Sequence, residues 1–207
     1  MNIVKSKSFK NGTVYCLRLE DGMLVETTDT FLPYYTKDAI GRKQNFLDNN
    51  NLGSRAERWM IGVSTMSGCP VRCKFCATGN MKKYRNLTAD EIVEQVLFAI
   101  RSAGYNPNDS KEFKINYTRM GEPFLNIEAV KKAIERITEI SENRGILYNY
   151  PQVDQAAIDI LHQQNIFCGV WSVDDTETAQ KYIDYGVDFI VTNEIPARIN
   201  HMVNDNE

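Results

Sequence analysis

The chain has 207 residues, of which 43% are hydrophobic and 25% are charged, and its formal net charge is −3. This length is enough for one good core with a small appended segment. No apolar run is long enough to span a bilayer and no signal-peptide pattern begins the chain, so we expect a cytoplasmic protein without a membrane partner. Three of the five cysteines fall within eight residues, which indicates metal or redox chemistry rather than a disulfide framework.

Charge is unevenly distributed along the chain. Residues 1–145 contain 22 Lys and Arg against 17 Asp and Glu, whereas residues 146–207 contain 2 against 10. A basic front and an acidic back predict two segments of different character. Ordinary variation of surface charge is the alternative explanation.

Residues 1–58 are predicted to form a β-rich N-terminal cap. Thr13 to Glu20 and Met23 to Thr27 alternate as strands do, and Asp21-Gly22 predicts a two-residue type I′ hairpin turn between them. Residues 28–58 are polar and broken by proline and glycine, so we expect a loop with one short helix at most.

Residues 59–145 are predicted to alternate between strands and helices. Trp59 to Thr65 and Phe113 to Tyr117 have the length and composition of strands. Thr88 and Glu91 form a capping box before a helix that ends near Gly104. A second helix follows Asn126 and ends by Gly145.

The same alternation continues through residues 146–199. Strands are predicted at Ile146 to Tyr150, Ile166 to Val173 and Val187 to Thr192, with helices at Val153 to Gln163 and Thr176 to Tyr185. Residues 200–207 are predicted to be a frayed tail. The whole pattern predicts an α/β protein with an incomplete (β/α) barrel-like parallel sheet, short of the eight units that close a barrel.

Cys69, Cys73 and Cys76 are the candidate metal ligands. Their short spacing lets three thiolates converge on one metal centre and leaves one coordination position open. A structural zinc site would normally need a fourth ligand, and His162 and His201 are distant in sequence.

Gly121-Glu122-Pro123 is expected to lie close to this cysteine loop. The loop follows the strand at residues 59–65, and the Gly-Glu-Pro segment follows the strand at residues 113–117. Because active sites of parallel α/β proteins lie at the carboxyl ends of strands, both motifs are expected on the same edge of the sheet.

The cysteine loop carries a specific resemblance. Cys69-Pro70-Val71-Arg72-Cys73-Lys74-Phe75-Cys76 resembles the CxxxCxxC signature of the radical S-adenosylmethionine (radical SAM) superfamily. Within it, residues 10–143 are similar to the enzymes that methylate C2 of adenine in ribosomal and transfer RNA. The segments that carry this likeness are Leu17 to Gly22, Gly68 to Gly79, Arg85 to Thr88, Met120 to Pro123 and Leu125-Asn126.

The resemblance implies a cofactor set and a reaction. Cys69, Cys73 and Cys76 would hold a 4Fe–4S cluster whose open iron binds S-adenosylmethionine (SAM), and a one-electron donor such as flavodoxin or ferredoxin would supply the electron for reductive SAM cleavage. Phe75 would lie beside the adenine, and Gly121, Glu122 and Pro123 would contact the cofactor. The resemblance leaves the catalytic residue unassigned.

Basic residues near the cysteine loop are candidate RNA contacts. Beside a catalytic edge they could hold phosphates, and the alternative is an ordinary solvated face. These residues are Arg72, Lys74, Lys82, Lys83 and Arg85.

The chain departs from the RNA-methylating family in three places. A cysteine that the family has before its cluster loop falls here at Gly62, and Cys168 is the one candidate for its late cysteine, in surroundings that do not match. Residues 146–198 resemble instead the C-terminal part of glycerophosphodiester phosphodiesterases, without the catalytic motifs of that family. The sequence therefore favours a radical SAM protein over a complete methyltransferase. The alternatives are a phosphodiesterase-like protein, a catalytically inert composite and a zinc-binding protein.

Overall fold

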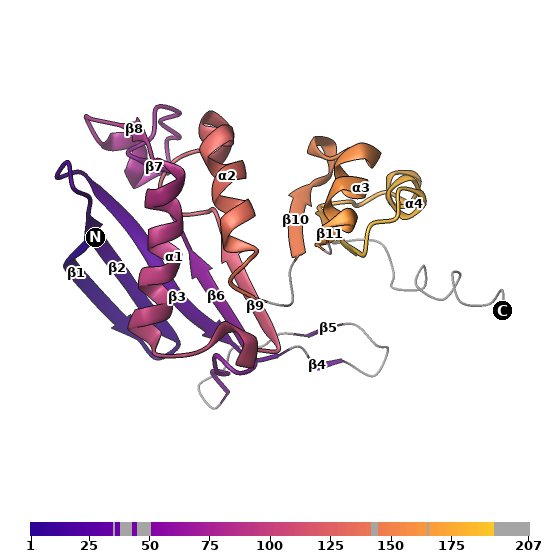
Figure 1. The fold of residues 1–207 in the computed structure, drawn as a ribbon, viewed down its shortest axis with the longest axis horizontal. Helices are drawn as coiled ribbons and strands as arrows, with labels where there is room; N and C mark the ends of the chain where they lie inside the picture. Colours follow the sequence, from indigo (N-terminus) through magenta and orange to yellow (C-terminus); the bar gives the residue numbers. More distant parts are fainter. Residues whose placement is uncertain (35, 38–42, 45–50, 142–144, 165, 193–207) are drawn as a thin grey trace. The chain divides into compact units, whose positions relative to one another are not determined.

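The computed structural model describes residues 1–34, 36–37, 43–44, 51–141, 145–164 and 166–192 (Figure 1). The chain divides into two compact units. Unit 1 comprises Met1–Thr36 and Gln44–Ser141, and unit 2 comprises Lys37–Lys43 and Glu142–Glu207. The predicted tail at residues 200–207 lies outside the described residues.

Unit 1 is built on a mixed five-stranded sheet. Its strands are β1 (Asn2–Phe9), β2 (Gly12–Arg18), β3 (Leu24–Leu32), β6 (Arg58–Gly62) and β9 (Glu112–Asn116), in the order β1-β2-β3-β6-β9 (Figure 1). The β6–β9 pair is parallel and the other three pairs are antiparallel. The expectation of an α/β fold with parallel pairing is therefore confirmed, whereas the described strands do not form one continuous parallel sheet.

The N-terminal strands extend this sheet, although the sequence predicted a separate cap. β3 continues past Thr27 to Leu32 and pairs with β6 along its second half. The polar composition of residues 28–58 predicted a loop, but Asp29 is buried and its carboxylate accepts hydrogen bonds from Arg55 and Trp59. Because these partners satisfy the charge, the strand continues through it.

The β2–β3 turn also differs from the predicted type I′ turn. Gly22 has φ +84°, whereas Asp21 is not among the positive-φ residues that a type I′ turn requires. The Gly22 amide donates to the Leu19 carbonyl at 3.0 Å, and the Leu19 amide donates to the Met23 carbonyl at 2.8 Å. The connection is therefore a three-residue loop that ends on a left-handed glycine.

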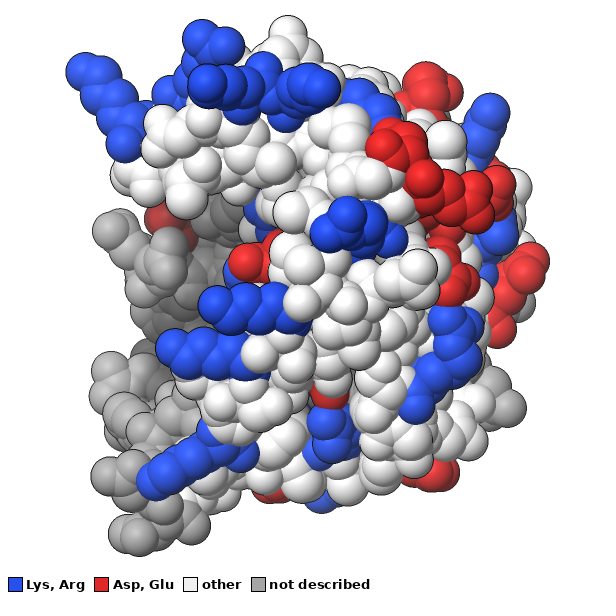
Figure 2. All heavy atoms as spheres, turned by 90° about the vertical axis from the view of Figure 1, so that its left-hand side faces the viewer, with Lys and Arg blue, Asp and Glu red and all other residues white. Residues whose placement is uncertain are grey.

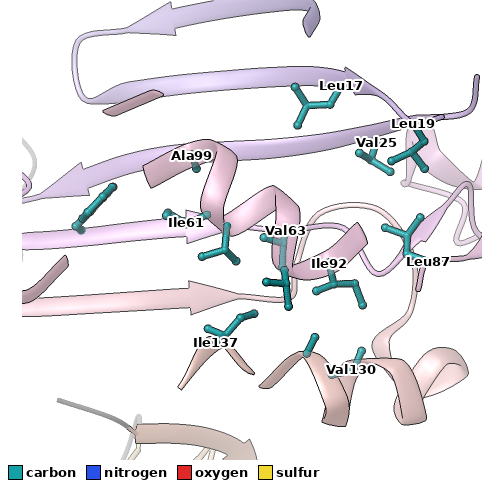
Figure 3. Packing of buried hydrophobic residues seen from close by; sticks show 14 residues of the cluster. Leu17, Leu19, Val25, Ile61, Val63, Leu87, Ile92, Ala99, Val130 and Ile137 are labelled. Carbon is teal, nitrogen blue, oxygen red and sulfur yellow. The ribbon is translucent and has the colours of Figure 1, made fainter. Parts of the chain in front are cut away.

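Two helices cover one face of the sheet. α1 (Ala89–Ala103) begins at the predicted Thr88–Glu91 capping box and ends at Gly104 in the left-handed region, and α2 (Ile127–Ile137) packs beside it (Figure 1). Figure 3 shows aliphatic side chains of β2, β3, β6 and both helices meeting between sheet and helices. Trp59 and Ile61 belong to this core, so strand alternation turns Met60 and Gly62 to the opposite face.

Short elements complete unit 1. They are the strand pair β7 (Met66–Ser67) with β8 (Arg85–Asn86), and the 3₁₀ turns η1 (Ala77–Asn80), η2 (Pro107–Asp109) and η3 (Pro123–Asn126). A further short strand pair is β4 (Thr36–Lys37) with β5 (Lys43–Gln44).

A buried polar network replaces the regular ladder just beyond β6. The Gln95 side chain on α1 accepts from the Ser64 amide at 2.9 Å and donates to the Ser64 carbonyl at 3.0 Å. The Thr27 hydroxyl also donates to Gln95 at 2.9 Å. All three residues are fully buried, so each of these groups depends on the others for its hydrogen bonds. This network fixes α1 against the end of β6.

We expect Gln95→Ala to destabilise unit 1. The substitution leaves the buried Ser64 amide and carbonyl without their partner, which costs about 1–3 kcal/mol. Urea unfolding followed by Trp59 fluorescence in a Trp171→Phe background measures it, because the chain has 2 tryptophans and Trp59 lies in the unit 1 core. Glu94→Ala, at an exposed ion pair on the same helix, is the control and should change stability little. Equal stability of the two variants would contradict this role of the network.

Unit 2 contains a three-stranded parallel sheet. Its strands are β10 (Gly145–Asn149), β11 (Phe167–Trp171) and β12 (Phe189–Val191), in that order. α3 (Gln155–Gln163) and α4 (Thr176–Asp184) connect them, and η4 (Tyr150–Gln152) follows β10. These elements agree with the predicted strand and helix alternation.

Side-chain caps define the helices of unit 2. Asp154 accepts from the Ala157 amide at 2.9 Å, and Asp175 accepts from the Thr178 amide at 2.8 Å. Both carboxylates satisfy amides at a helix N-terminus, where negative charge is favourable. Among the helices that the structure describes, none is long and apolar enough to cross a membrane.

Candidate metal centre

The two predicted motifs are joined by backbone hydrogen bonds at one edge of the unit 1 sheet. The Met120 carbonyl accepts from the amides of Thr65 at 2.8 Å and Met66 at 3.1 Å. Thr65 and Met66 lead into the cysteine loop, and Met120 directly precedes Gly121. The expectation that both motifs lie on the same edge is confirmed.

Asn126 ties a third segment to this edge. Its side-chain amide donates to the carbonyls of Thr65 and Leu87, each at 2.8 Å, and the residue is buried. The Asn86 side chain donates in turn to the Leu125 carbonyl at 2.9 Å. The segments of β7, β8 and η3 are therefore fixed to one another, which the sequence did not predict because the partners are far apart along the chain.

Gly79 lets two parts of the cysteine loop approach each other closely. A Cβ at Gly79 would lie 2.7 Å from the Cα of Arg72, so the backbone approaches too closely for any side chain there. Arg72 has φ +52°, a left-handed conformation that is costly for a residue other than glycine. Strained backbone of this kind occurs often at functional sites.

The three thiols differ in their surroundings. Cys69 is buried, Cys76 is half-buried and Cys73 is exposed. Hydrogen bonds from the Gly79 backbone and from the side chain and backbone of Thr78 lower the pKa of the Cys76 thiol, which favours the thiolate that binds metals. A thiolate-rich donor set on a short loop fits an iron–sulfur cluster.

The thiols are nevertheless not gathered into a closed ligand set. Within the described ranges, no three His, Cys, Asp or Glu side chains are arranged so that they could hold a metal ion. The loop thus has suitable donors on one edge, and Cys73 is the candidate ligand that lies most open to solvent.

Gly121 and Glu122 have specific local roles. Gly121 has φ +98°, and a Cβ there would lie 2.6 Å from the Cβ of Met66 and 2.7 Å from its amide nitrogen. The Glu122 carboxylate accepts from the Phe124 amide at 3.2 Å and caps η3, whose first residue is Pro123. Glycine at position 121 therefore lets the Gly-Glu-Pro segment approach the cysteine loop.

The predicted basic residues fall into two groups. Arg85 forms ion pairs with Asp21 at 2.6 Å and with Glu91 at 2.7 Å, and these partners raise its pKa above the usual range. It therefore fixes the β2–β3 turn to the start of α1.

Lysines and arginines gather at the upper edge of the face in Figure 2, the end of unit 1 where Figure 1 draws β7 and β8. The exposed basic residues of this segment are Arg72, Lys74, Lys82 and Lys83.

Exposed apolar side chains lie among these charges. The Phe75 side chain is 93% exposed, which excludes a role in core packing. Four more large apolar residues of the same segments are about half exposed: Val71, Tyr84, Phe124 and Leu125. An exposed mixture of basic and aromatic side chains is typical of surfaces that bind nucleic acids.

Comparison with known proteins finds relatives that match part of this chain. No family model matches. A probable dual-specificity RNA methyltransferase RlmN of Chlorobium phaeobacteroides strain BS1 is 38% identical over 119 residues, which are 58% of this chain and 33% of that protein. The dual-specificity RNA methyltransferase RlmN of Sulfurimonas denitrificans is 32% identical over 140 residues, 67% of this chain and 36% of that protein.

A solved structure shares the fold. The crystal structure of a radical SAM methyltransferase from Sphaerobacter thermophilus has a TM-score of 0.50 and 23% identity, and the match covers 87% of this chain and 48% of that chain. The chain spans about a third of the length of the curated relatives, 33% and 36% in the two cases given above. These matches give no support to the phosphodiesterase resemblance of residues 146–198.

We expect Gly121→Ala to destabilise unit 1 more than Gly104→Ala does. Both positions have positive φ, so alanine is strained at each, at a cost above about 1 kcal/mol. Only Gly121 also faces a clash, because a Cβ at Gly104 meets nothing within 4 Å. Urea midpoints of the two variants, read by Trp59 fluorescence, measure the difference. An equal loss at both positions would show that Met66 does not constrain Gly121.

Proposed function

We propose that this chain is a radical SAM protein that cleaves S-adenosylmethionine reductively and acts on RNA, as a relative of the RNA adenine methyltransferases. The observation that carries the proposal is the pair of hydrogen bonds from Thr65 and Met66 to Met120, which sets the cysteine loop beside Gly121-Glu122-Pro123. The RNA methyltransferases that match the chain support the same reading.

In this proposal Cys69, Cys73 and Cys76 hold a 4Fe–4S cluster, and Phe75, Gly121, Glu122 and Pro123 bind SAM. When bound, the cluster supplies the electron that breaks a carbon–sulfur bond of SAM. The protein's own part is to hold the cofactor: Gly121 allows close backbone approach, and Glu122 offers a carboxylate to the SAM ammonium group. An electron donor such as flavodoxin or ferredoxin completes the reaction.

The proposal does not extend to methyl transfer through a cysteine. Position 62 is a glycine whose Cβ, if present, would lie 2.5 Å from the Thr28 hydroxyl. Cys168 belongs to unit 2 and is fully buried, and burial, with the nearby charge of Asp188, raises the pKa of its thiol to about 11. A buried protonated thiol is a poor nucleophile.

We expect anaerobic reconstitution to load about four irons with inorganic sulfide per chain. Cys73→Ala should abolish loading, because it removes one of three ligands, whereas Cys16→Ala on β2 should leave loading unchanged. Iron, sulfide and zinc analysis with visible absorbance measures the outcome. One zinc without sulfide would contradict the proposal and favour a zinc-binding protein.

We expect RNA binding to depend on the exposed lysines beside the cysteine loop. Lys82→Ala and Lys83→Ala should each weaken binding and lower the slope of log affinity against log salt by about 1, since each removes a phosphate contact. Lys131→Ala, at an exposed side chain on α2, is the matched control. Filter binding to an unpaired RNA oligonucleotide at several salt concentrations gives both quantities. Equal effects of all three substitutions would contradict a specific role of Lys82 and Lys83, because general charge attraction would then account for RNA binding.

A further inference from the structure

An ion pair lies on the face of the unit 1 sheet that the helices leave uncovered. Arg119, two residues before Gly121, pairs through its guanidinium with the carboxylate of Glu26 on β3. The Arg119 side chain is 34% exposed and that of Glu26 is 37% exposed, so a ligand could reach both. The pair therefore carries accessible charge near the edge that holds the cysteine loop.

The backbone beneath this pair is held from both sides by Ser64. The Ser64 hydroxyl accepts from the amides of Glu26 and Met120, each at 3.2 Å, and donates to the Glu26 carbonyl at 2.7 Å. The Arg119 amide donates to the Val63 carbonyl at 3.1 Å. Both partners of the ion pair thus stand on backbone that a buried hydroxyl fixes, as a preorganised binding site requires.

Gly62 provides the room in which the Arg119 side chain lies. A Cβ at Gly62 would lie 2.9 Å from the Cδ of Arg119. Ile61 points into the core between sheet and helices, so the contact with Gly62 places Arg119 on the opposite face. Burial of this side chain lowers the pKa of Arg119, which indicates that its charge is partly removed from water. Partial desolvation strengthens its attraction for an anion.

We propose that Arg119, held in place by Glu26 and Gly62, binds the carboxylate of the methionine part of SAM. This inference rests on the proposed function, which places SAM at Gly121, Glu122 and Pro123, next to Arg119 in the chain. The carboxylate is the negatively charged group of SAM, and a guanidinium recognises a carboxylate in a fixed, bidentate geometry. The guanidinium has several N–H donors, so it can hold a second carboxylate beside that of Glu26. The negative charge of Glu26 repels a multiply charged phosphate more strongly than a singly charged carboxylate.

Paired ligands that differ in one group test this assignment. Cluster-loaded protein, without reductant, is dialysed to equilibrium against SAM and against decarboxylated SAM. The Kd for decarboxylated SAM divided by the Kd for SAM measures recognition of the carboxylate. We expect Arg119→Ala to lower this ratio by about tenfold or more, because a charge-assisted hydrogen bond is lost. Arg119→Lys should restore part of the ratio.

Two further variants separate binding from folding. Gly62→Ala should lower the same ratio, because its methyl group displaces Arg119, whereas Arg101→Ala, at an exposed ion pair on α1, should leave the ratio unchanged. Urea unfolding checks each variant. If Arg119→Ala does not fold, Arg119→Gln carries the test, since it removes the charge and keeps most of the side chain.

The outcomes distinguish the two proposals. Wild-type protein that loads a cluster but binds neither ligand would overturn the proposed function together with this inference. Wild-type protein that prefers SAM, with the same ratio in Arg119→Ala, would overturn the inference alone. An equal loss of both ligands in Arg119→Ala would assign Arg119 a structural role and would also overturn it.

Discussion

Unit 1 depends on the way in which Ser64 is hydrogen-bonded just beyond the end of β6. Its amide and carbonyl are satisfied by Gln95 from α1, and its hydroxyl is shared between Glu26 and Met120. Buried polar groups without such partners would each cost about 1–3 kcal/mol, so these bonds fix α1, β3 and the segment after β9 relative to one another. Cys69, the first cysteine of the loop, lies three residues after Met66. The loop therefore starts from a backbone that these hydrogen bonds fix.

Residues at this edge of the sheet fall into two groups: those whose side chains hold the structure together and those whose side chains are exposed to ligands. Arg85 is held by two carboxylates and Asn126 by two carbonyls, so both act on the structure. Cys73 and Phe75 are exposed on the cysteine loop. A fixed frame that presents exposed candidate ligands agrees with the proposed centre, in which a cluster and SAM would bind at this edge.

The change in charge along the sequence coincides with a change in architecture. The acidic part of the chain begins near residue 146, and the larger segment of the second compact unit begins at Glu142, after the end of α2 at Ile137. In unit 1 the helix-covered sheet is mixed, with one parallel pair, and in unit 2 the described strands are all parallel. Each unit has its own buried cluster of apolar residues, so each unit is stabilised by a core of its own.

The sequence by itself determined part of the local structure and the choice of candidate ligands in the cysteine loop. The Thr88–Glu91 capping box, the left-handed Gly104 and the spacing of the three cysteines depend on neighbours in the chain, and short-range rules describe them. The tertiary structure alone decided that β3 continues through Asp29, that Arg85 is an internal ion-pair partner and that Arg119 lies over Gly62. In each case a partner is distant in sequence: Trp59 for Asp29, Asp21 for Arg85 and Gly62 for Arg119. Such contacts exist only once the strands and helices have packed.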